Sequence, residues 1–276
     1  MVKITTLKKR TLNPHLNPSD YLTVFASADT NGLVSAKIDM ESCSLTYWLS
    51  AGGYYNCPSR KVLYRILSQD LFSLRLAEHE KKESVVMRRV RNPIPMYAFG
   101  IWDVKLPDEK GVYGFDMKLG DLVAPFGVGQ VADFHIRKDF CQYPRTTKSA
   151  LFFKGKGNGG YKTRAFDESA FRSPYTADTN ANFNTEFRYA LSAEQGWDSE
   201  VCDVGEDECL ILRTRCRFNE NGNLSSCHYS KIYGKIDIFD RLHFRAYAFN
   251  PTPNDPNLEF DVNRNLFKKD TAPYLP

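Results

Sequence analysis

One segment of this chain reads Leu210-Ile211-Leu212-Arg213-Thr214-Arg215-Cys216-Arg217-Phe218 and alternates between two classes of residue. A period of two residues is that of a half-buried β-strand, because successive side chains of a strand point to opposite faces. The segment therefore predicts a strand with Leu210, Leu212, Thr214, Cys216 and Phe218 on one face and Arg213, Arg215 and Arg217 on the other.

The residues that follow are Asn219-Glu220-Asn221-Gly222-Asn223. Asn-Gly is a strong hairpin signal, because both central residues of a tight two-residue turn need positive φ angles. If Asn221 and Gly222 alone form the loop, the chain makes a hairpin with a defined register. That register opposes Arg213 to Ser230, Arg215 to His228, Cys216 to Cys227 and Arg217 to Ser226.

Six of the seven cysteines group into local pairs along the chain. Directly opposed α-carbons of antiparallel strands lie roughly 4.5–5.5 Å apart, which is within the range of a disulfide. These local pairs suggest disulfide bridges, although seven reduced thiols in a cytosolic protein stay open as the alternative. No CxxC or Cys/His spacing is present, so we expect no metal site. The spacing predicts the bridges Cys43–Cys57, Cys202–Cys209 and Cys216–Cys227, which leave Cys141 unpaired.

The composition is that of a packed globular protein, with 42% hydrophobic and 13% aromatic residues in a chain of 276. The formal net charge of +4 is too small to argue for a nucleic-acid partner. Residues 1–10 lack the apolar region of a signal peptide, and no apolar run approaches the roughly 18 residues of a membrane span. An intracellular protein and a secreted protein that has lost its signal at Met1 both stay open.

Segments with strand character recur every 8–12 residues or so between turn signals, which is typical of an antiparallel β-sandwich or a jelly-roll-like fold. We therefore expect an all-β chain, or a mainly β chain with one or two short helices, in a single domain over residues 1–276. Residues 185–194 are the best candidate for a helix, whereas residues 60–80 favour two strands. A proline-rich extension runs from about residue 250 to residue 276. Its residues 250–256 hold three prolines and cannot be a central strand, so we expect an extended surface segment there that leads to the tail.

The C-terminal region also carries a resemblance. It reads Tyr233-Gly234-Lys235-Ile236, then Phe249-Asn250-Pro251-Thr252-Pro253-Asn254-Asp255-Pro256-Asn257-Leu258-Glu259-Phe260-Asp261, then Asn263-Arg264-Asn265-Leu266-Phe267. These residues resemble the C-terminal segment of uncharacterised, β-rich bacterial proteins of a secreted type, over about the last fifth of the chain. The resemblance implies an extracellular or periplasmic location and carries no known activity.

Three further segments contain residue types that occur in functional sites. Residues 154–164 are rich in glycine and lysine but lack the Gly-Lys-Ser/Thr ending of a phosphate-binding loop, so we expect a flexible hairpin loop. Residues 178–186 alternate oxygen-bearing side chains as calcium loops do, but without the required Gly and Glu, and we expect a polar turn. Asp133 and His135 would face the same way on a strand, as an acid–base pair does, although a buried structural histidine is commoner. No nucleophile or cofactor motif is present, so we expect no cofactor.

The arginine row is the best candidate for a binding site. Alternate residues of a strand lie about 6.8 Å apart, and guanidinium groups bind carboxylates and sulfates through two parallel hydrogen bonds. We expect a non-enzymatic binding or structural protein of the bacterial envelope or exterior, with an anionic polysaccharide as partner. A carbohydrate-active enzyme on a β-sandwich, a subunit of a homo-oligomer or larger assembly, and a merely solvated strand face stay open. The candidate ligand-binding residues are Arg213, Arg215, Arg217 and His228.

Overall fold

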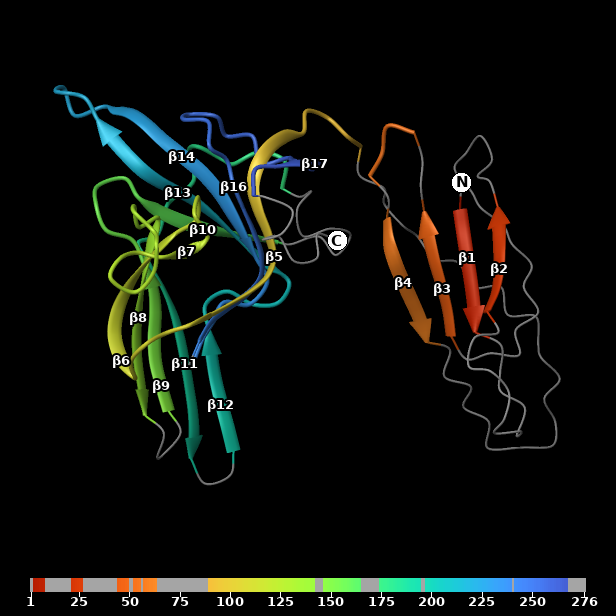
Figure 1. The fold of residues 1–276 in the computed structure, drawn as a ribbon, viewed down its shortest axis with the longest axis horizontal. Coiled ribbons are helices and arrows are strands. Elements are labelled where there is room, and N and C mark those ends of the chain that lie inside the picture. The colour runs from red at the N-terminus through yellow and green to blue at the C-terminus, as the bar shows by residue number, and fades with distance from the viewer. Residues whose placement is uncertain are drawn as a thin grey trace. The chain divides into compact units, whose positions relative to one another are not determined.

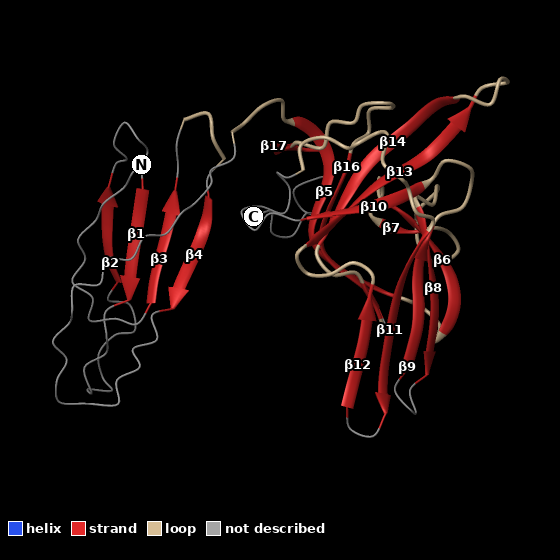
Figure 2. Cartoon of the chain, turned by 180° about the vertical axis from the view of Figure 1, so that it is seen from behind, coloured by secondary structure: helices blue, strands red, loops and turns tan. Residues whose placement is uncertain are grey.

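The computed structural model describes residues 2–7, 21–26, 44–49, 52–55, 57–63, 89–141, 146–164, 174–194, 197–239 and 241–267. The chain divides into two compact units, Met1–Val90 and Arg91–Pro276. Every regular element that the described residues form is a strand, as Figure 2 shows by colour, and the all-β expectation is confirmed. Within these ranges no helix has the length and apolar character needed to cross a bilayer.

The first unit contains a four-stranded antiparallel sheet, with the order β2-β1-β3-β4 (Figure 1). Its strands are rich in β-branched and aromatic residues, which fit a pleated surface. A second Asn-Gly pair, Asn31-Gly32, also predicts a hairpin, but it lies outside the described residues, as does most of the stretch 60–80. The strands are β1 (Val2–Leu7), β2 (Tyr21–Ala26), β3 (Ser44–Leu49) and β4 (Cys57–Leu63).

The second unit contains two larger sheets. The hairpin sheet has the order β10 (Gly159–Arg164), β13 (Glu208–Phe218), β14 (Leu224–Tyr233), β16 (Arg241–Phe249), β5 (Ile94–Lys105) and β17 (Phe260–Asn265), and β15 (Asp237–Ile238) pairs with β16. The facing sheet has the order β12 (Trp197–Cys202), β11 (Glu186–Glu194), β9 (Thr146–Phe152), β8 (Phe134–Cys141), β6 (Lys110–Asp116) and β7 (Asp121–Leu122). All pairings are antiparallel except that of β17 with β5.

These two sheets pack against each other around an aromatic and aliphatic core. Phe115 of β6 stacks on Phe134 of β8 with ring centroids 5.1 Å apart. The same Phe115 meets Tyr247 of β16 edge-on at 6.1 Å, so this contact crosses from one sheet to the other. All three side chains are buried, and aromatic residues supply much of the burial energy of such cores. The expected sandwich is confirmed.

The hairpin sheet is buried on its other face as well. Cys209 and Ile211 of β13 belong to a second apolar cluster, which also includes Leu258 and Phe260. Ile211 was predicted to lie on the solvated arginine face, and it is 0% exposed. The half-buried strand was therefore the wrong prediction for residues 209–212, because the C-terminal segment covers them. A strand covered on both faces reads as a continuous apolar run.

Residues 250–256, which precede that covering segment, were expected on the surface: residues 251–256 are exposed or half-buried, whereas Asn250 and residues 258–260 are buried. The Asn250 amide donates to the carbonyls of Asp255 and Asn257, at 3.0 and 2.8 Å. Its side-chain oxygen also accepts from the N–H of Thr252, at 2.8 Å. The proline-rich segment cannot form regular strand pairing, and the buried side chain of Asn250 instead forms hydrogen bonds with three of its backbone groups.

The helix expected over residues 185–194 is wrong, since these residues form β11. Phe187 and Tyr189 are buried, whereas Glu186 and Arg188 are exposed, which is the period of a strand. Pairing with both β9 and β12 fixes the segment in the facing sheet. Tertiary pairing overrides the helix-like sequence here.

Candidate functional site

The β13–β14 hairpin forms, but its turn is longer than predicted. The Asn219 N–H donates to the Asn223 carbonyl and the Gly222 N–H donates to the Asn219 carbonyl, both at 2.9 Å. Gly222 has φ 76°, whereas Asn221 does not have a positive φ. This is a three-residue loop that ends in a left-handed glycine, the next commonest hairpin loop after the two-residue form. The extra loop residue shifts the register by one at Phe218–Leu224, and an irregularity between Phe218 and Arg217 restores the predicted register at Arg217.

A β-bulge then interrupts β13 where Arg215 and Cys216 together oppose Cys227. Arg215 has φ 54°, which is uncommon for a residue other than glycine. The bulge turns Arg215 toward the facing sheet instead of away from it. The predicted pair Arg217–Ser226 forms, whereas Arg213 opposes Tyr229 and His228 opposes Thr214, so the predicted partners of Arg213 and Arg215 are wrong.

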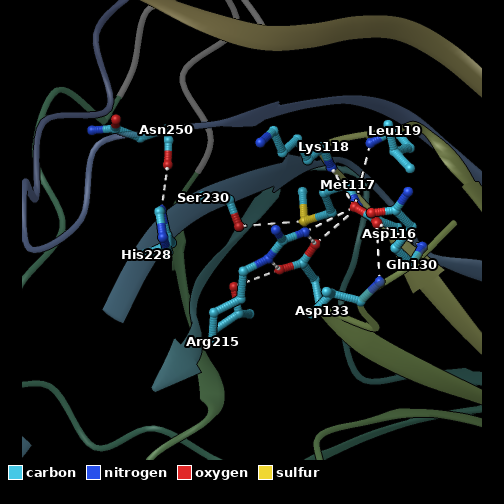
Figure 3. A network of polar contacts seen from close by, with 12 residues as sticks. Asp116, Met117, Lys118, Leu119, Gln130, Asp133, Arg215, His228, Ser230 and Asn250 are labelled. Carbon is cyan, nitrogen blue, oxygen red and sulfur yellow. Dashed lines mark hydrogen bonds and ion pairs between the residues drawn. The ribbon is translucent and has the colours of Figure 1, made fainter. Parts of the chain in front are cut away.

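The Arg215 side chain is held by two buried carboxylates of the facing sheet (Figure 3). Its Nε and Nη2 donate to the two oxygens of Asp133, each at 2.8 Å. Nη2 also donates to Oδ1 of Asp116 at 2.8 Å. Asp133 further accepts from the Thr214 hydroxyl and the Met117 N–H, both at 2.9 Å. Such a bidentate, charge-assisted arrangement fixes the guanidinium plane.

Asp116 is the more heavily bonded of the two acids. Its oxygens accept the N–H groups of Lys118, Leu119, Gln130 and Val131 at 3.0 to 3.3 Å. Burial alone would raise the pKa of Asp116, but these backbone donors and the Arg215 charge hold the pKa below its ordinary value. The carboxylate is therefore ionised and its charge is compensated from several directions.

His228 lies beside Arg215 on the same aromatic ring. The imidazole stacks on Phe249 with centroids 5.4 Å apart, and the guanidinium carbon of Arg215 is 4.8 Å from the centre of that ring. Nδ1 of His228 donates to the Asn250 carbonyl at 3.2 Å. Burial is the main cause of the lowered pKa of His228, and the charges of Arg215 and Lys118 lower it further. Asn250 and Asp133 act in the opposite direction.

Arg217 shares this face of the hairpin. A Cβ added at Gly157 would lie 2.8 Å from the ring of Phe218 and 3.4 Å from Cβ of Cys216, so both of these side chains point toward Gly157. Strand alternation then places Arg217 on the opposite face, with its partner Ser226. We name this surface the hairpin face; it consists of Lys118, Arg215, Arg217, Ser226 and His228.

Arg213 does not belong to the hairpin face. Its guanidinium carbon lies 3.9 Å from the centre of the Phe183 ring, and its Nε donates to the Gly157 carbonyl at 2.9 Å. Both partners lie on the side of the sheet where Cys216 also packs. The three arginines therefore do not form one row: Arg213 and Arg217 lie on different faces, and Arg215 is used internally.

The predicted disulfides of the described residues are not present: Cys202, Cys209, Cys216 and Cys227 are reduced thiols. Cys202 packs against the core between the two sheets, whereas Cys209 of β13 belongs to the second apolar cluster, on the other face of the hairpin sheet. The hairpin sheet therefore lies between the two thiols. Cys216 and Cys227 lie on one face, but the bulge breaks their direct opposition. Cys43 lies outside the described residues, as does the side chain of Cys57.

The other segments singled out by sequence have structural roles. The glycine loop packs against the tip of β13, where the Asn158 side chain accepts from the Cys216 N–H at 3.0 Å. Asp178 caps its own turn by accepting the Asn180 N–H at 2.9 Å. His135 stacks on Phe152 with centroids 5.3 Å apart, whereas the carboxylate of Asp133 is bonded to Arg215.

Sequence reasoning missed Lys118 and Asp116 altogether. Asp116 is the last residue of the alternating strand β6 and Lys118 lies two residues beyond it, but nothing local indicates that this end of the strand meets the hairpin of another sheet. In the comparisons with known proteins, no family model, curated protein or solved structure matches this chain.

Proposed function

We propose that this chain is a non-enzymatic binding protein whose hairpin face binds an anionic glycan. The observation that carries the proposal is that Arg217 and His228 share one face of the hairpin with the anchored Arg215, and that the charge of Lys118 also acts on His228. Lys118 and Arg217 are exposed, and no acidic side chain of the described ranges forms an ion pair with either. Cations without a partner at a fixed spacing suit the carboxylates or sulfates of a polysaccharide.

The charges of Asp116 and Asp133 do not cancel this surface. Their side chains are 2% and 0% exposed, and their oxygens accept hydrogen bonds from Arg215 and from backbone N–H groups. The charges of this surface that are accessible to solvent are therefore the ammonium group of Lys118 and the guanidinium group of Arg217.

Retention on an acidic polysaccharide column tests this proposal. Arg217→Glu and Lys118→Glu should each lower the salt concentration of elution, and the double variant should elute with the flow-through, because fewer counterions are displaced. Lys110→Glu is the matched control. Its side chain is 73% exposed, and it lies at the opposite end of β6 from Asp116, on the order of 20 Å away. Equal elution of the wild type, the two single variants and the double variant would refute binding at this face.

A further inference from the structure

The connection from β6 to β8 exposes an unusual group of apolar side chains. Leu119 is 41% exposed, Phe126 44%, Val128 73% and Val131 46%. Four of the exposed large hydrophobic residues of this unit thus occur within one short connection. We name residues 119–131 the apolar loop. Single exposed apolar residues are ordinary, but such a group marks a surface that another apolar phase covers.

The apolar loop is held in shape by its own hydrogen bonds. Asp121 accepts the N–H groups of Leu122 and Val128 at 2.7 and 2.9 Å, and Asp116 accepts two more. A parallel bridge joins Val123 to Gly129. The backbone N–H groups that donate are those of Leu122, Val123, Ala124, Phe126, Val128, Gly129, Gln130 and Val131.

This internal bonding bears on what covers the loop. A hydrocarbon phase offers no hydrogen bonds, so a segment that enters it must satisfy its N–H groups from within. The apolar loop does so almost completely. Its one acid, Asp121, is occupied by backbone donors. A protein partner would impose no such requirement, since it could supply bonds of its own.

The apolar loop is continuous with the hairpin face. Asp116 accepts from Arg215 at 2.8 Å and from the backbone of Leu119 and Val131 at 3.3 and 3.1 Å, so one carboxylate joins the two surfaces (Figure 3). Lys118 directly precedes Leu119. Apolar side chains beside cations match a bilayer whose surface carries anionic headgroups.

We infer that the apolar loop docks this protein on the surface of an anionic lipid bilayer, with Val128 and its neighbours among the acyl chains. The loop has no length to span the bilayer, so the binding is peripheral. Each deeply inserted side chain should change the affinity about tenfold or more. The inference is independent of the glycan proposal, although Lys118 and Arg217 serve in both.

Vesicle co-sedimentation tests the inference. The wild type should bind vesicles of phosphatidylcholine with phosphatidylglycerol, and bind vesicles of phosphatidylcholine alone more weakly. Val128→Asp should reduce the binding about tenfold or more. Val201→Asp is the matched control, because Val201 is 57% exposed and lies on β12, at the other edge of the facing sheet from β7. Thermal unfolding should show that both variants remain folded.

Three results would each overturn the inference. The first is a Val128→Asp variant that binds anionic vesicles as the wild type does, and the second is a wild type that binds neither kind of vesicle. The third is light scattering that shows a wild-type dimer and a Val128→Asp monomer, because a second copy would then cover the loop. Polysaccharide retention measured on the same Val128→Asp sample separates the two proposals: unchanged retention leaves the glycan proposal standing whatever the vesicles show.

Discussion

The guanidinium of Arg215 donates to both carboxylate oxygens of Asp133, with two nitrogen–oxygen distances of 2.8 Å. This pair joins β13 of the hairpin sheet to the residue that precedes β8 of the facing sheet. Arg215 reaches Asp133 because its backbone has φ 54°, a conformation that costs roughly 1–2 kcal/mol for an ordinary residue. The bulge and the ion pair therefore depend on each other.

Replacing Arg215 with leucine should destabilise the fold by about 3–5 kcal/mol, because the substitution leaves the buried charge of Asp133 without its partner. Urea denaturation measures this as a lower transition midpoint. Arg217→Leu is the control on the same strand, and since Arg217 is exposed it should change the free energy of unfolding by no more than about 0.5 kcal/mol. Equal midpoints for the two variants would contradict a structural role for the Arg215–Asp133 pair.

The sequence was a good guide where the information is local. Alternation in β6 and β13 predicts strands, and Asn221-Gly222 predicts the reversal between β13 and β14. The same Asn-Gly pair fits both a two-residue and a three-residue loop, however, and the two differ by one position in register. The composition likewise changes little at Val90, where the first compact unit ends.

The candidate site was out of reach of local patterns. Arg215 leaves the predicted row because Asp133 and Asp116, about 80 to 100 residues earlier, provide a buried partner. His228 lies near Arg215 as expected, but through the ring of Phe249 and not through strand pairing. Such contacts depend on how the two sheets pack, which a single sequence does not encode in its periodicity.

Gly159 should be intolerant of any side chain. A Cβ there would lie 2.8 Å from the Asn184 carbonyl oxygen and 3.0 Å from Cβ of Phe183. Gly159→Ala should therefore destabilise the protein by about 1–3 kcal/mol through overpacking. At Gly205 the nearest atom would be 3.8 Å away, so Gly205→Ala should be neutral or slightly stabilising. Thermal unfolding compares the two, and a greater loss at Gly205 would contradict the packing described for Gly159.

The thiols should differ sharply in reactivity. Cys209 is 0% exposed, and burial raises its pKa to about 12, whereas Cys141 is exposed. Because the thiolate is the reactive form, iodoacetamide should modify Cys141 in the native protein and reach Cys209 only after unfolding. Peptide mass spectrometry after digestion measures each site separately. If Cys209 were modified as fast as Cys141 under native conditions, the second apolar cluster, which buries Cys209, would have to unfold locally and often.

Lys231 should make stability depend on pH. Its side chain is 0% exposed, its Nζ donates to the Pro174 carbonyl at 3.3 Å, and burial lowers its pKa from 10.5 to about 7, against the opposing effects of Cys209 and Glu259. At a pH between these two pKa values, Lys231 is protonated in the unfolded chain and neutral in the folded chain. Folding stability should therefore fall as the pH is lowered through this interval, by a few kcal/mol in all.

Lys231→Met removes the titrating group and should stabilise the protein at pH 7 by a few kcal/mol, with a much smaller gain near pH 10. Urea denaturation at the two pH values measures the difference. Lys148→Met, at an exposed position of β9, serves as the control and should leave the pH dependence unchanged. If Lys231→Met instead destabilised the protein equally at both pH values, the ammonium would be charged in the folded state, and desolvation would not govern its pKa.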